Sequence, residues 1–324
     1  MLGVPALTLL PLLWRIEPRL IAFEAVAPQL AAAAAVLAIL CLLLGRRWRA
    51  LLAAALVAWN LVLIWPEISP FGDRAAAAMQ NGAAPLKVLS MNLWYANRDP
   101  EATRAYLATS GADLIGLVEM TPRLKEQLAA LRAVYPYEVD CVGAADPTCE
   151  IMLLSKRPLR NPRAGRIAGR YPYVAQAEID WNGLSIGIAM THFSWPFMIP
   201  GAPVLSATSL PQPIPELPDL PRLSQSVQAA NLAAYAPSLP ADLIVMGDFN
   251  GPSWSADLKA LQTATGLKGP GGLLLTWPTW AWPVFRVPID HVTVRGRLQV
   301  TKINAGPDVG SDHLPVEAEI AVKQ

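Results

Sequence analysis

Polar side chains that could do chemistry follow short apolar runs at several places in this sequence. The clearest case is LIVMGDFNGPSW, residues 243–254, where an apolar run delivers Asp248 and Asn250 into a turn rich in glycine and proline. An ordinary strand exit explains any single case, but α/β proteins tend to place chemistry at strand ends. All 3 histidines of the chain stand at such ends, so we interpret the set as one site. Its other members are Asn92, Glu119, His192, Asp290 with His291, and Asp312 with His313.

These residue types suit metal-assisted cleavage of a phosphoester. Amide and carboxylate oxygens are the ligands that Mg²⁺ prefers, and Mn²⁺ accepts the same set. An Asp–His pair is the arrangement of a general base whose imidazole is oriented by a carboxylate. Zinc is disfavoured, because the chain has no HExxH motif and no cluster of cysteine and histidine with ligand spacing.

A sheet-rich domain is needed to bring these ends together. From Lys87 onward, short apolar runs alternate with helical patterns, which predicts one α/β domain over residues 87–324. The expected strands are 88–92, 114–119, 151–155, 174–180, 184–191, 243–248, 289–294 and 316–322. The expected helices are 100–110, 122–134, 222–236 and 255–265.

Taken in order, the motifs resemble the endonuclease/exonuclease/phosphatase superfamily, whose deoxyribonuclease-like members include abasic-site endonucleases, inositol polyphosphate 5-phosphatases and neutral sphingomyelinases. The resemblance spans residues 87–322 and implies a four-layered α/β sandwich with two mixed β-sheets. It also implies a divalent-metal-dependent hydrolase that acts on a phosphodiester or phosphomonoester. The motifs are Asn92, Glu119, Thr191-His192, Gly247-Asp248-Phe249-Asn250, Ile289-Asp290-His291 and Ser311-Asp312-His313.

The resemblance also implies a role for each matching residue. Asn92 and Glu119 would hold the Mg²⁺, with Asp312 close enough to help. Asp248 would orient the attacking water, and Asn250 would contact the transferring phosphoryl oxygens.

The histidines receive roles on the same basis. His313, paired with Asp290, would act as general base or as a phosphate ligand, and His192 would hydrogen-bond the phosphate. Arg286 is left without a role, because it lies farther from Asp290 than the basic residue of many relatives.

The N-terminal part of the chain indicates a membrane region over residues 1–66. Residues 25–44 carry no charge and have about the ~20 residues that a helix needs to cross a bilayer. A basic turn follows, and residues 50–66 form a second uncharged run. Residues 2–14 are apolar but short, and indicate at most a short third helix. Residues 67–86 are expected to be a linker.

The basic turn and the cysteines suggest on which side the domain lies. Arg46, Arg47 and Arg49 favour a cytoplasmic turn, which would put the domain on the outer, periplasmic side of the inner membrane. Cys141 and Cys149 lie in one short loop and could form a disulfide in an oxidising compartment.

The sequence leaves the substrate open. The net charge is only +1, whereas proteins that bind many nucleic-acid phosphates are usually basic. The membrane region and the proline-rich apolar stretch 195–221 favour a lipid-linked or envelope phosphoester. A membrane-anchored nuclease and a non-catalytic binding module are the alternatives, and no obligate protein partner is evident. The densest basic cluster, which could contact nucleic acid or anionic lipid, is Lys156, Arg157, Arg160, Arg163, Arg166 and Arg170.

Overall fold

The computed structural model describes residues 3–13, 18–68, 84–144, 146, 148–196 and 225–323. Its strands are β1 (Leu86–Asn92), β2 (Leu114–Val118), β3 (Tyr137–Asp140), β4 (Met152–Ser155), β5 (Arg160–Ile167), β6 (Arg170–Trp181), β7 (Leu184–His192), β8 (Leu243–Asp248), β9 (Asp290–Arg295), β10 (Leu298–Ala305) and β11 (Val316–Val322). The longer helices are α2 (Ala27–Leu43), α3 (Arg47–Ile68), α4 (Pro100–Thr109), α5 (Pro122–Gln127), α6 (Gln225–Tyr235) and α7 (Ala256–Thr265).

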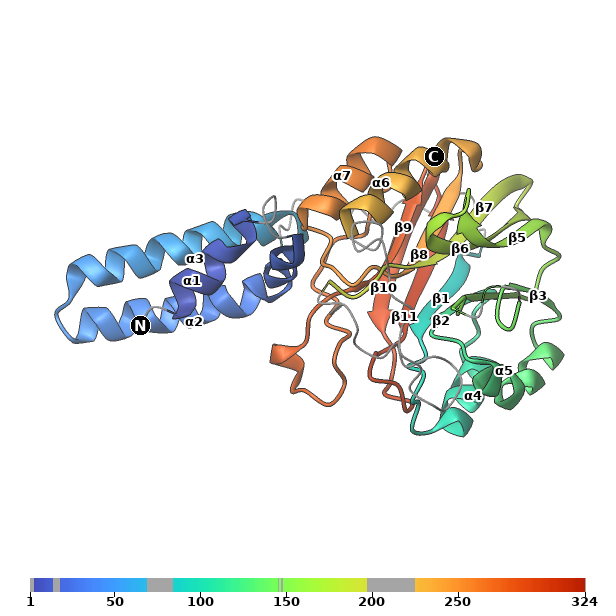
Figure 1. The fold of residues 1–324 in the computed structure, drawn as a ribbon, viewed down its shortest axis with the longest axis horizontal. Coiled ribbons are helices and arrows are strands. Elements are labelled where there is room, and N and C mark those ends of the chain that lie inside the picture. The colour runs from blue at the N-terminus through green and yellow to red at the C-terminus, as the bar shows by residue number, and fades with distance from the viewer. Residues whose placement is uncertain are drawn as a thin grey trace.

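The strands form two mixed sheets that pack face to face. One sheet has the order β10-β11-β1-β2-β4-β3, and the other has the order β5-β6-β7-β8-β9. The pairs β1–β2 and β7–β8 are parallel, and the remaining pairs are antiparallel. In Figure 1, α4 and α5 cover one outer face and α6 and α7 cover the other. The four-layered α/β sandwich expected from the sequence is therefore confirmed.

Three apolar clusters hold these layers together. The largest lies between the sheets and contains Val88, Ile188 and Met246. A second cluster packs α4 and α5 on the first sheet, and a third packs α6 and α7 on the other. Because the central strands β2, β4 and β8 are buried on both faces, their sequences are nearly continuous apolar runs rather than alternations.

The N-terminal apolar segments form a helical hairpin that projects from the sandwich (Figure 1). Two stretches, Leu20–Leu43 and Arg47–Ile68, are long and apolar enough to cross a membrane. Only 28% and 17% of their most apolar windows are buried, unlike the core helices of a soluble domain. Residues 3–13 form a shorter apolar helix that falls below spanning length.

The base of this hairpin is hydrogen-bonded to the sandwich domain. The indole Nε1 of Trp254 donates to the carbonyl of Glu24 over 2.8 Å, and the hydroxyl of Ser253 donates to Glu67 over 2.6 Å. Ala27 and Ile64 pack on Trp254. Helix α3 ends at Ile68, so it uses the first residues of the expected linker, and residues 69–83 lie outside the described part.

The structure contains all the predicted helices and strands, and three further strands that were not predicted. Every expected strand and helix is present within a few residues, although helix 122–134 is divided into α5 and a 3-10 turn, Ala129–Ala133. Strands β3, β5 and β10 were not expected, because they are short or half-exposed and lack an apolar run. Of the proline-rich stretch, residues 197–221 lie outside the described residues.

Gly247 is a position where the fold tolerates no side chain. Its φ is +147°, and an added Cβ would collide with the carbonyl oxygen of Thr191 on the paired strand β7. We expect Gly247→Ala to lower the free energy of unfolding by about 3 kcal/mol, measured by denaturant titration. Gly111→Ala is the control, because Gly111 has φ +75° and open space around it, so only the backbone strain of about 1 kcal/mol applies. Equal losses in the two variants would contradict the steric argument.

Candidate active site

The inward-facing positions of four strands end in polar residues at one end of the sandwich. Side chains alternate along a strand, and Ile244 and Met246 of β8 face the opposite sheet, so Asp248 faces it too. The same even-numbered series places Asn92 at the end of β1. It also places His192 at the end of β7 and Asp290 at the start of β9. In the register of the second sheet, Asp248 lies directly beside both His192 and Asp290.

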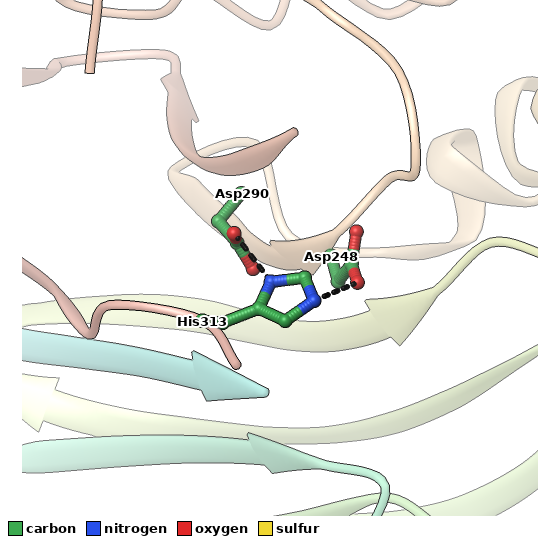
Figure 2. A group of neighbouring side chains, drawn as sticks. All are labelled: Asp248, Asp290 and His313. Atoms are coloured by element: carbon green, nitrogen blue, oxygen red, sulfur yellow. Dashed lines mark hydrogen bonds and ion pairs between the residues drawn. The ribbon is translucent and has the colours of Figure 1, made fainter. Parts of the chain in front are cut away.

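The first histidine–carboxylate pair joins His313, in the loop before β11, to Asp290 at the start of β9. His313 Nδ1 lies 2.8 Å from Asp290 Oδ2, and its Nε2 lies 3.7 Å from Asp248 Oδ2 (Figure 2). Burial alone would lower the pKa of His313, but the charges of Asp290 and Asp248 raise it to about 10. The imidazole is therefore held as a cation at neutral pH, with its Nδ1 proton on the Asp290 side.

A second histidine–carboxylate pair faces the first. His192 Nδ1 lies 2.7 Å from Glu150 Oε1, and Nε2 lies 3.7 Å from Asp248 Oδ2. Burial acts to lower the pKa of His192, but the hydrogen bond to Glu150 and the nearby carboxylates raise it to about 9. The sequence did not point to Glu150, which directly follows the disulfide between Cys141 and Cys149. The disulfide considered from the loop spacing is thus present.

Asp248 lies between the two pairs and is nearly inaccessible to solvent. Its Oδ2 accepts from the Asn92 amide over 3.0 Å, and its Oδ1 accepts from the backbone N–H of Asn250 over 2.7 Å. Burial, followed by the charge of Asp290, raises the pKa of Asp248 to about 6. The Asn250 amide donates to the Phe193 carbonyl over 2.7 Å and lies 3.2 Å from Nε2 of His192.

Asn92 and Glu119 meet at the ends of β1 and β2. The Asn92 amide nitrogen donates to Glu119 over 2.8 Å, and the amide oxygen accepts from the backbone of Trp94. Glu119 would face away from the other sheet if the alternation of β2 continued. Its φ of +54° breaks the alternation and turns the carboxylate into the site, where the Tyr95 N–H also donates to it. This backbone conformation is uncommon for a residue other than glycine, asparagine or aspartate.

Asp312 is a further carboxylate that interacts electrostatically with Glu119. Its Oδ2 accepts from the indole Nε1 of Trp277 over 3.1 Å. Its Oδ1 is buried and has no hydrogen-bond partner among the described residues. Burial raises the pKa of Asp312, and the charge of Glu119 acts in the same direction. Apart from a 3.9 Å ion-pair contact with Nε2 of His313, Oδ1 is free to bind a cation, and a cation would relieve the repulsion between the Asp312 and Glu119 carboxylates.

A cation could bind at two places in this geometry. The ligand atoms of Asp248, Asp290 and His313 lie within 4.8 Å of one another and could hold a metal ion. A metal there would have to displace the proton from an imidazole that is already hydrogen-bonded. Glu119 and Asp312 are not part of that group, but a cation held by them and by the Asn92 amide oxygen would need no such change, and these oxygens suit Mg²⁺.

Two residues in or near the expected motifs, His291 and Arg286, make structural contacts instead. His291 Nε2 lies 2.8 Å from the Gly251 carbonyl, and burial lowers the pKa of His291, which keeps it neutral. Arg286, which received no role, donates to the carbonyls of Ala281 and Thr279 over 3.1 and 2.8 Å. Neither is part of the two pairs around Asp248.

The comparisons agree with this architecture. Residues 89–313 match the Endonuclease/Exonuclease/phosphatase family, and because this match covers more than half of the chain, the chain belongs to that family. A search of curated proteins finds no match.

Solved structures share the fold at low sequence identity. The endonuclease/exonuclease/phosphatase from Bacteroides vulgatus is 14% identical, with a TM-score of 0.56 over 74% of this chain and 100% of that one. TDP2 of D. rerio, solved with a single-strand DNA product, is 14% identical, with a TM-score of 0.54 over the same shares. A beta toxin double mutant from Staphylococcus aureus with bound magnesium ions is 13% identical, with a TM-score of 0.50, also over 74% and 100%.

Proposed function

We propose that this protein is a membrane-tethered, Mg²⁺-dependent phosphoesterase that cleaves a phosphodiester by attack of an oriented water. The observation that carries the proposal is the convergence of two histidine–carboxylate pairs on Asp248. Nε2 of His192 and Nε2 of His313 each lie 3.7 Å from the same oxygen of Asp248. Two imidazoles that converge on one carboxylate could donate to phosphoryl oxygens, while the carboxylate could orient a water.

The side chains of the site divide the work between them. The deprotonated form of Asp248 would orient the water and accept its proton, because its raised pKa of about 6 gives it useful basicity near neutral pH. His313, held as a cation by Asp290, would stabilise the negative charge on the phosphoryl oxygens. His192 and Asn250 would bind those oxygens from the other side. The high pKa of His313 favours a phosphate ligand over a general base among its two expected roles.

Asn92, Glu119 and Asp312 would hold the metal ion, which supplies positive charge to the phosphoryl group when bound. The orphaned Oδ1 of Asp312 and the neighbouring carboxylate of Glu119 support this assignment. The magnesium ions in the beta toxin of S. aureus, which shares the fold, are consistent with it. Mn²⁺ would serve in the same oxygen-rich site.

For the substrate, we favour a lipid-linked or envelope phosphoester over nucleic acid. The basic cluster that could follow a nucleic-acid backbone is partly used within the protein. Arg160 pairs with Asp180 over 2.7 Å, and Arg166 pairs with Asp146 over 2.9 Å. A nuclease remains the second candidate, because TDP2 of D. rerio, with the same fold, was solved with a DNA product.

The expected topology is a multi-pass inner-membrane protein with its domain on the outer side. The exposed apolar hairpin and the disulfide of Cys141 support this placement. A reporter enzyme that works only in the periplasm should be active when fused to the C-terminus. Activity of a C-terminal reporter that works only in the cytoplasm would show the opposite orientation.

The test is an assay of the full chain in detergent and in vesicles. Bis(p-nitrophenyl) phosphate should be hydrolysed with Mg²⁺ or Mn²⁺, and a chelator should abolish turnover. A panel of phospholipids, DNA and RNA then ranks the substrates, and the proposal expects phospholipid to be preferred. Preferred cleavage of DNA or RNA would establish the nuclease. If the folded protein hydrolyses no phosphoester, the result would favour the non-catalytic binding module.

A further inference from the structure

One loop of the domain exposes a group of large apolar side chains. Residues 278–286, here called the tryptophan loop, connect the site residue Trp277 to strand β9. Trp280 and Trp282 are 73% and 78% exposed, and Val284 and Phe285 are 64% and 65% exposed. Contiguous apolar side chains in water are costly, and such patches usually mark a surface that contacts a protein or a membrane.

Internal hydrogen bonds hold the tryptophan loop in shape. The guanidinium of Arg286 donates to the carbonyls of Ala281 and Thr279, and Pro283–Phe285 form a 3-10 turn. The charge of Arg286, the one ionisable side chain of the loop, is therefore directed inward. The exposed tip is left with aromatic and aliphatic groups alone.

The loop lies beside the base of the helical hairpin. The side-chain amide of Gln29, in the first turn of α2, donates to the carbonyls of Val284 and Arg286 over 3.1 and 2.8 Å. Ala25 and Val26 pack on Val287, just after the loop. Figure 1 shows the loop, in orange, on the same side of the domain as the hairpin.

We propose that the tryptophan loop inserts into the interfacial region of the bilayer that α2 and α3 span. Its occupant is the lipid surface rather than a protein, because the loop is continuous with the base of two exposed apolar helices. Tryptophan is enriched where a membrane meets water, since the ring is apolar and its N–H is polar. This inference rests on the membrane placement given under the proposed function.

The position of the loop also narrows the class of substrate. The Thr279 hydroxyl donates to the carbonyl of Ser311 over 2.9 Å, and its backbone N–H donates to the carbonyl of Asp312 over 2.8 Å. Trp277, at the start of the loop, donates to Asp312 and contacts Trp195 at a centroid distance of 5.2 Å. A loop seated in the interface would hold Asp312 and the mouth of the site at headgroup depth. The substrate is then a phosphoester in the headgroup of a lipid in that same bilayer.

The first test measures the depth of the loop directly. An environment-sensitive fluorophore on Trp282→Cys, in a Cys41→Ser background reconstituted in phosphatidylglycerol/phosphatidylethanolamine vesicles, should be quenched by nitroxides at headgroup or shallow acyl-chain depth. The control label is Arg123→Cys, an exposed position at the start of α5 on the far side of the domain, and should not be quenched. Equal absence of quenching at both positions would overturn the proposal. This readout does not depend on catalysis, so it stands apart from the proposed activity.

The second test separates membrane docking from chemistry. The triple variant Trp280→Ser, Trp282→Ser, Phe285→Ser should lower turnover of vesicle phospholipid about tenfold or more, because burying such side chains contributes more than 1.4 kcal/mol. Hydrolysis of soluble bis(p-nitrophenyl) phosphate should change less than about twofold, since none of the three contacts the site. Trp48→Ser, an exposed tryptophan at the opposite end of the hairpin, is the control and should leave both rates unchanged. A triple variant that keeps full turnover of vesicle lipid, or loses both activities equally, would overturn the proposal.

Discussion

Replacing His313 with Gln should lower the turnover number about 10³-fold, within the range that removal of a positioned proton-transfer or charge-stabilising group costs. Replacing Asp290 with Asn should cost a similar factor, because Asp290 Oδ2 is 2.8 Å from His313 Nδ1 and holds the imidazolium. The two losses should not multiply in the double variant, since each removes the same pair. Steady-state kinetics with a soluble phosphodiester measure the turnover number of the two single variants and of the double variant.

The neighbouring histidine supplies the control for this cycle. His291 lies in the next position of β9 but contacts the Gly251 carbonyl rather than a carboxylate. His291→Gln should therefore affect stability more than turnover. A double variant of His313 and Asp290 that is slower by the product of the single effects would show that the pair does not act as a unit.

The part of the site that the sequence predicts is the set of polar residues that border apolar runs. Asn92, His192, Asp248 and Asp290 border apolar runs, which was enough to group them as polar strand ends. That all four continue inward-facing series is visible only in the structure. The separate strands themselves were found because buried strands are runs of Val, Ile, Leu and Met. The order of the strands in the two sheets was not predicted from the sequence and is given by the structure.

Other parts of the site could not be read from the pattern. Glu150 follows a loop rather than an apolar run, and its 2.7 Å contact with His192 depends on how β4 and β7 lie in different sheets. Glu119 was predicted as a strand-end residue, but its side chain enters the site only because its φ of +54° reverses the alternation, which no residue pattern indicates. Trp277 is anchored to Asp312 across 35 residues, so its role depends on the tertiary fold.

The exposed aromatic surface shows the same limit. The sequence predicts a contact with lipid at residues 195–221, because that stretch is rich in proline and apolar residues. Residues 197–221 lie outside the described part, so that expectation stays a prediction. Within the sandwich domain, the described residues place a group of exposed apolar side chains at 280–285, which the sequence analysis did not single out. Exposure is a property of the fold, and Gln29 on α2 is what fixes this loop beside the hairpin.

Removing the proposed metal ligand Glu119 should lower the turnover number about as much as replacing His313. Glu119→Gln keeps the shape of the side chain and its hydrogen bond to the Tyr95 N–H, but it removes the charge that a divalent cation needs. Turnover should fall about 10³-fold, because the cation would no longer be held beside the phosphoryl group. The free energy of unfolding without metal should change little, since Glu119 ends a strand and is not part of an apolar cluster.

Metal binding itself gives a readout that does not require activity. A cation that binds only the folded chain stabilises it, by about 2.7 kcal/mol at a concentration 100 times the dissociation constant. Mg²⁺ or Mn²⁺ should therefore raise the unfolding temperature of the wild type and of a surface control, Glu138→Gln, whose carboxylate pairs with Arg132. The same ions should leave Glu119→Gln unshifted. If Glu119→Gln responds like the control while His313→Gln does not, the cation binds at Asp248, Asp290 and His313 instead, and the assignment to Glu119 and Asp312 is wrong.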